Sequence, residues 1–243
     1  MANYLNNNYN IINNNYSNPQ DINYYKDIII DSFNSDLLDN SFIVFNSINN
    51  IIYLIYINKN KSIISFDLVN NKKISEIKNA HNKYITNFRY YLDKNTKIEY
   101  FISISSKDNN IKLWNVENLV CLCDIQSIYN EGGLSSACFL NDNNKNYIIS
   151  SNDNYYIYKL DYSNESIKVY DFKGNIIKKI YNSEYPTFFI DSYYDKKLNK
   201  NFIIIGNKGN VKSYDYNKNE IYIVIIIIMN YIQVLLLMNI MII

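Results

Sequence analysis

The sequence predicts an all-β fold assembled from short antiparallel strands in a repeating order. Runs of about four to seven residues rich in Ile, Val, Tyr and Phe recur between Ser41 and about Glu220, and such residues suit a pleated, half-buried surface. Clusters of Asn, Asp, Lys and Ser separate these runs, as turns separate strands. No stretch of this region repeats apolar residues at helical spacing over a long window. Together, these three observations favour strands over helices.

Eight of these runs are the predicted strands, because β-branched and aromatic residues dominate each of them. In chain order they are Ile51–Ile57, Ser62–Asp67, Tyr100–Ser105, Ile111–Trp114, Tyr147–Ser150, Tyr155–Leu160, Phe202–Gly206 and Val211–Tyr214. Asn154–Asp161 and Ser166–Asp171 both have the pattern of the third strand of one unit. We therefore expect one of these two segments to be an insertion or a strand extension.

The two ends of the chain differ from this middle region. Residues 1–40 are rich in Asn and Tyr, and we expect a disordered leader that buries too little apolar surface to become ordered. Ile221–Ile243 carries no charge over 23 residues, which is long enough for a membrane-spanning helix of about 20 residues. Alternatively, Ile221–Ile228 supplies the last strand of the fold, and the remainder is AT-rich sequence translated in error.

Composition argues against nucleic acid as a partner. The net charge is +1, the lysines are scattered, and Arg89 is the only arginine. Arginine provides most bidentate recognition of phosphate and guanine, and nucleic-acid-binding proteins normally cluster their basic residues on one face. Asn is abundant while Gly is scarce, so we expect Asn in turns that require a left-handed backbone.

No catalytic, cofactor-binding or metal site is predicted. The chain has one histidine and three cysteines, whereas a structural zinc site requires four ligands and a disulfide framework an even number of cysteines. Neither a phosphate-binding glycine loop nor a dinucleotide-binding glycine motif is present. The N-terminus lacks the basic and apolar regions of a secretory signal, so we expect a cytoplasmic, reducing location.

One unit recurs along the chain, in which a strand ends in an aromatic residue followed by Asp or Asn. The aromatic positions are 48, 56 and 44 residues apart. The pairs are Phe66 with Asp67, Trp114 with Asn115, Tyr170 with Asp171, and Tyr214 with Asp215. A fixed spacing of this order is typical of proteins that stack one supersecondary unit on the next.

The best copy, Tyr100–Glu117 (YFISISSKDNNIKLWNVE), resembles the WD40 repeat. Asp108 precedes Trp114 by six residues, as in that family, and His81 follows Ala80 where the family places Gly-His. The resemblance implies a β-propeller in which the His, a strand Ser, the turn Asp and the Trp form a hydrogen-bonded network. His81, Asp108 and Trp114 would take three of these places, and either Ser103 or Ser105 the fourth.

The resemblance implies about four four-stranded blades over residues 41–220, in a partial propeller. Four blades of this width are not expected to close a ring, so we expect a fragment, a truncated reading frame or a propeller completed by another chain. Tyr or Phe replaces Trp in the other three copies. We therefore expect those blades to lack the full network and to depend on core packing alone.

The function expected from this resemblance is a non-catalytic scaffold for protein–protein interaction, whose partner the sequence does not identify. A second hypothesis is a tail-anchored membrane protein with a cytosolic propeller-like head, which depends on Ile221–Ile243. A third hypothesis is a propeller enzyme, which would need carboxylates or a metal gathered in one cleft.

Overall fold

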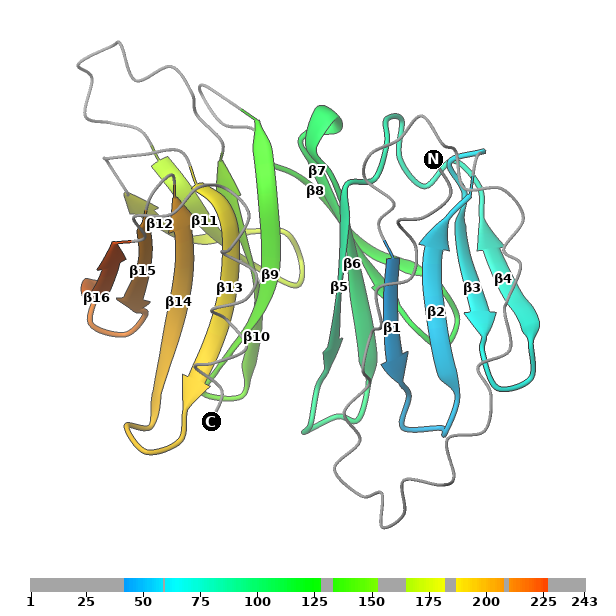
Figure 1. Cartoon of the computed structure of the whole chain (residues 1–243), viewed down its shortest axis with the longest axis horizontal. Coiled ribbons are helices and arrows are strands. Elements are labelled where there is room, and N and C mark those ends of the chain that lie inside the picture. Colours follow the sequence, from blue (N-terminus) through cyan, green and yellow to red (C-terminus); the bar gives the residue numbers. More distant parts are fainter. Residues whose placement is uncertain are drawn as a thin grey trace, which may run out of the picture. The chain divides into compact units, whose positions relative to one another are not determined.

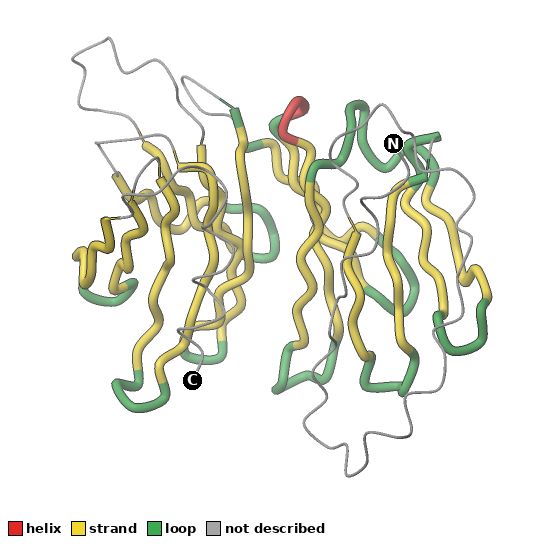
Figure 2. The backbone as a smooth tube through the Cα atoms, in the orientation of Figure 1, coloured by secondary structure: helices red, strands yellow, loops and turns green. Residues whose placement is uncertain are grey.

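A computed structural model describes residues 42–58, 60–127, 133–152, 165–181, 187–207 and 210–226. Within these ranges the fold is all-β, as predicted from the strand pattern, and the one helical element is a single 3-10 turn, Ser106–Asp108 (Figure 2). The strands form four antiparallel sheets of four strands each, and every sheet takes its strands in chain order.

We number these sheets 1 to 4 along the chain (Figure 1). Sheet 1 contains β1 (Phe42–Asn46), β2 (Ile52–Ile57), β3 (Ile63–Asp67) and β4 (Lys72–Ile77). Sheet 2 contains β5 (Asn87–Leu92), β6 (Glu99–Ser105), β7 (Asn110–Asn115) and β8 (Cys121–Gln126). Sheet 3 contains β9 (Leu134–Asp142), β10 (Lys145–Asn152), β11 (Glu165–Asp171) and β12 (Ile176–Tyr181). Sheet 4 contains β13 (Thr187–Asp195), β14 (Lys200–Asn207), β15 (Asn210–Asp215) and β16 (Glu220–Ile226).

The four sheets share one register between their second and third strands. In each sheet, the aromatic residue that ends the repeated unit lies directly opposite a large apolar residue of the second strand. These pairs are Leu54 with Phe66, Phe101 with Trp114, Ile148 with Tyr170, and Ile203 with Tyr214. The repeat inferred from sequence is therefore a repeat of strand pairing as well as of residue type.

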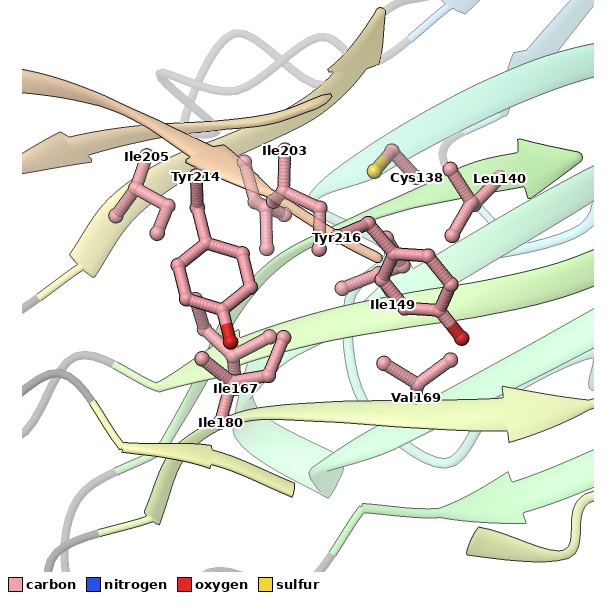
Figure 3. Packing of buried hydrophobic residues seen from close by; sticks show 11 residues of the cluster. Cys138, Leu140, Ile149, Ile167, Val169, Ile180, Ile203, Ile205, Tyr214 and Tyr216 are labelled. Carbon is pink, nitrogen blue, oxygen red and sulfur yellow. The ribbon is translucent and has the colours of Figure 1, made fainter. Parts of the chain in front are cut away.

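Each sheet packs its face against the next sheet along the chain. One buried cluster joins sheets 1 and 2, a second joins sheets 2 and 3, and a third joins sheets 3 and 4. In the third cluster the ring of Tyr214 points toward Ile167 and Ile180 of sheet 3 (Figure 3). The first strands of successive sheets also contact one another, since β5 touches β1 and β9, and β9 touches β13.

Sheets 2 and 3 are buried on both faces. On β6, Phe101 belongs to the cluster shared with sheet 1, while Ile102 belongs to the cluster shared with sheet 3. On β10, Ile148 faces sheet 2 and Ile149 faces sheet 4. Successive residues of a strand point to opposite faces, so the continuous apolar runs found in the sequence are those of strands covered on both sides.

Asparagine occupies the strained turn positions, as expected. Eight of the eleven non-glycine residues with positive φ in the described residues are Asn. Asn reaches the left-handed region more readily than most residues, because its short amide bonds to the local backbone. Asn therefore takes the place in these turns that glycine takes in most proteins.

Seven of the eight predicted strands lie in second or third strands of the sheets, whereas Tyr155–Leu160 lies outside the described residues. Ser166–Asp171 falls in β11, so this segment supplies the third strand of sheet 3. The first six residues of the apolar run Ile221–Ile243 belong to β16, and its other residues, like the leader 1–40, are outside the described ranges. In the part of the chain that is described, no helix has the length and apolar character to cross a bilayer.

Candidate functional site

A buried hydrogen-bonded corner joins the β4–β5 connection to strands β6 and β7. Ser103 Oγ on β6 lies 2.7 Å from His81 Nε2 and accepts a hydrogen bond of 2.8 Å from Trp114 Nε1 on β7. The three side chains are 6 %, 0 % and 4 % exposed for His81, Ser103 and Trp114. We call these three residues the corner network.

Two residues expected in this network bind nearby backbone groups instead. Asp108 Oδ2 accepts a hydrogen bond of 2.7 Å from the Lys83 N–H, because the half-buried 3-10 turn brings its carboxylate to the loop after His81. Ser105 Oγ donates to the Tyr84 carbonyl at 2.9 Å. Ser103 is thus the serine that joins His81 to Trp114, and Asp108 fixes the loop that carries His81.

The corner consists of buried side chains that bond to one another. His81 Nδ1 is buried without a hydrogen-bond partner among the described residues, so no carboxylate orients the ring as it would in a nucleophilic triad. Burial, aided by the nearby Lys112 ammonium, lowers the pKa of His81 to about 4, whereas the Asp108 and Asp124 carboxylates oppose this shift. His81 is therefore a neutral hydrogen-bonding group at physiological pH, and Ser103 is fully buried between its two partners.

Sheet 3 contains an equivalent corner made of different residues. Ser150 on β10 corresponds to Ser103 on β6. Each serine lies two residues after the apolar residue that pairs with the aromatic of the third strand. Ser127 Oγ lies 3.1 Å from Ser150 Oγ and 2.8 Å from the hydroxyl of Tyr170, the counterpart of Trp114. This corner contains neither the His nor the Trp of the full network, but the expectation that sheet 3 depends on core packing alone was wrong. Serine and tyrosine hydroxyls make buried hydrogen bonds here in place of His and Trp.

The Asp or Asn of each repeated pair caps the turn between the third and fourth strands. In all four sheets its Oδ1 accepts two backbone N–H groups from the turn residues that follow. The capping residues are Asp67, Asn115, Asp171 and Asp215. Asp and Asn recur at this position because a short side-chain oxygen satisfies turn donors that no strand can reach.

A polar contact between successive sheets also repeats, and no sequence motif predicted it. In sheets 2, 3 and 4, the second strand has a polar residue two positions before the apolar residue that pairs with the aromatic. The side chain of this polar residue bonds to a residue that ends, or directly follows, the first strand of the preceding sheet. The contacts are Ser47 Oγ to Glu99 Oε2 at 2.5 Å, Asn146 Nδ2 to Asp93 Oδ2 at 2.9 Å, and Asn201 Nδ2 to Asp142 Oδ1 at 2.9 Å. We call Glu99, Asn146 and Asn201 the clasp residues. Each clasp fixes one sheet on its neighbour at the hairpin end of the stack.

A cleft of about 560 Å³ opens beside two of these clasps. Its walls come mainly from the β5–β6, β9–β10 and β13–β14 hairpins, which belong to sheets 2, 3 and 4. Seven of its twelve lining residues are asparagines, and two are the tyrosines Tyr91 and Tyr194. We call this feature the hairpin cleft. Sequence analysis missed it because its residues are turn residues that meet only when three sheets stack.

The chain matches no protein-family model and no curated protein. Among the described residues there is also no group of three or more His, Cys, Asp or Glu side chains arranged to hold a metal ion. The hairpin cleft and the stacked sheets are consequently the features from which a function is inferred.

Proposed function

We propose that this chain is a WD40-like β-propeller protein that acts as a non-catalytic scaffold for protein–protein interaction. The observation that carries the proposal is the shared register of the four sheets, in which the aromatic residue of each third strand pairs with an apolar residue of the second. Stacked four-stranded antiparallel sheets in chain order are the blades of such a fold. The contact of Ser103 with His81 and Trp114 supports the WD40-like assignment.

A stack of this kind suits binding because buried clusters join the sheets, whereas the hairpin loops at the ends of the sheets can differ in sequence. The clasps and the shared cores hold neighbouring blades together, so the hairpin ends keep fixed relative positions. Binding residues are commonly placed on loops that a rigid scaffold positions. In this protein the β5–β6, β9–β10 and β13–β14 hairpins are placed in this way, around the hairpin cleft.

The proposal is tested by purifying the full chain, with a tag, from extracts of its native source and then rebuilding each complex from purified components. We expect at least one protein that copurifies reproducibly and binds the purified chain in calorimetry with a negative heat-capacity change, as apolar surface is buried. The absence of any such partner over repeated purifications would refute the scaffold role.

A further inference from the structure

We propose that the hairpin cleft binds an uncharged peptide segment rich in amide and hydroxyl side chains. This inference rests on the proposed scaffold function and names the class of partner for one site on it. At about 560 Å³ the cleft is within the usual size of ligand sites, roughly 300–1,000 Å³. Most such sites are lined by apolar side chains, whereas here Leu92 is the one aliphatic residue among the described lining residues.

The charges in the cleft exclude strongly ionic ligands. Among the described residues of the lining, Lys94 is the one cation and Asp142 the one anion. A phosphate or polyanion site would need several cationic groups, because each unpaired anion loses its hydration on entry. A cationic segment would likewise find one carboxylate, and that group already accepts a hydrogen bond from Asn201.

The carboxamides of the cleft match the hydrogen-bonding groups of a peptide. Each asparagine has a carbonyl that accepts and an amino group that donates two hydrogen bonds. Every peptide unit other than proline likewise presents one donor and one acceptor. A surface that offers both kinds of group at many points therefore suits a backbone and short polar side chains.

The walls of the cleft are held in place before any ligand arrives. Asn95 Nδ2 donates to Asn144 Oδ1 at 3.1 Å, which links the hairpins of sheets 2 and 3. The Tyr194 hydroxyl donates to Asn199 Oδ1 at 2.5 Å within the hairpin of sheet 4. Preorganised side chains lose less conformational entropy on binding, so contacts made with them yield more affinity.

Tyr194 is the anchor that this arrangement provides. Its side chain is 48 % exposed on the cleft wall, and its hydroxyl is fixed by Asn199. Tyrosine offers a large amphipathic surface with few rotatable bonds, and surfaces that combine Tyr with Asn are typical of antibody paratopes that bind proteins and peptides. This composition favours a peptide over a small apolar molecule.

The chain contains a matched control for this residue. Tyr193 precedes Tyr194 on β13, is 49 % exposed, and is absent from the cleft lining. Neighbouring strand residues point to opposite faces, so the two tyrosines are similarly exposed but lie on opposite sides of the sheet. Removing either ring deletes a similar area of exposed aromatic surface.

The test selects binders to the full chain from a displayed library of random 12-residue peptides and measures each selected peptide by fluorescence anisotropy. We expect peptides of near-zero net charge enriched in Asn, Gln, Ser and Thr. Tyr194→Ala should weaken their binding at least tenfold, and Tyr193→Ala should change it less than twofold. Thermal melts of both variants should match that of the wild type.

Three outcomes would overturn this inference. Selection of strongly charged or apolar peptides would contradict the chemistry assigned to the cleft. Equal effects of Tyr193→Ala and Tyr194→Ala would place the binding elsewhere and leave the scaffold role standing. A glycan array that gives binding sensitive to Tyr194→Ala, with no peptide selected, would assign the cleft to a carbohydrate. Loss of the scaffold role itself is judged separately, by the failure of native copurification.

Discussion

Lowering the pH from 7.5 to 5 should destabilise the fold mainly through His81. Burial first, and the Lys112 ammonium second, lower the pKa of His81 in the folded chain to about 4, against an ordinary value of 6.5. The unfolded chain therefore binds more protons between these two values. Stability is fully present above about pH 6.5 and is lost progressively as the pH falls toward 4.

The size of the effect follows from the difference between the two pKa values. A difference of about 2.5 units corresponds to about 3 kcal/mol when fully expressed, since one unit is about 1.4 kcal/mol. At pH 5.5 the expected loss is about 1.4 kcal/mol, and at pH 5 about 2 kcal/mol. His81 is the one histidine of the chain. Carboxylates contribute mainly below this range, because their ordinary pKa values lie near 4.

Urea unfolding followed by tryptophan fluorescence measures this loss directly. Trp114 is the one tryptophan of the chain, is 4 % exposed and bonds to Ser103 in the same corner, so its emission reports on the network. His81→Gln cannot titrate in this range and should flatten the pH dependence between pH 7.5 and 5. The reasoning is refuted if the wild type loses less than about 0.5 kcal/mol at pH 5, or if His81→Gln shows the same slope.

Three further substitutions test the packing of the sheets, each by the free energy of unfolding in urea. Ser103→Ala removes the partner of two buried ring nitrogens and should cost about 2–4 kcal/mol, against about 1 kcal/mol for Ser105→Ala; equal costs would contradict the assignment of the corner. Asn146→Ala deletes the clasp to Asp93 and should cost about 2 kcal/mol, while a neutral result would show that the clasp adds nothing. Gly174→Ala should cost about 1–3 kcal/mol, because φ is +85° and the new methyl would lie 3.0 Å from a sulfur on β8; an unchanged midpoint would exclude strain at this turn.

The strands predicted from the sequence are the second and third strands of the sheets, which are rich in apolar residues. The first and fourth strands, at the edges of the sheets, were mostly not predicted. β6 is rich in Tyr, Phe and Ile because both of its faces are covered, one by sheet 1 and the other by sheet 3. In contrast, β4 (KKISEI) has no fully buried residue, and its lysines and glutamate resemble a turn. Edge strands of this kind are defined by pairing to a neighbour, which composition does not reveal.

The candidate sites differ in how much of each could be predicted from the sequence. The approach of His81 to Trp114 was expected from a resemblance in sequence, which left Ser103 and Ser105 as alternatives for the serine between them. Ser127, which replaces His81 in the corner of sheet 3, has no distinguishing neighbours in the sequence, and only the hydrogen bond to Tyr170 reveals its role. A single serine has no sequence pattern from which this contact could be predicted.

The clasp residues and the hairpin cleft have the same physical origin. Antiparallel hairpins leave unpaired polar groups at their ends, and these groups must bond to something when neighbouring sheets approach. Where a clasp forms, as between Asn201 and Asp142, the polar side chains satisfy one another. Where the three hairpins diverge, asparagines that already bond to neighbouring side chains line an open space, and a ligand with donors and acceptors of its own would use their remaining hydrogen-bonding capacity. The stacking that stabilises the sheets thus also creates the polar cleft on which a binding function would depend.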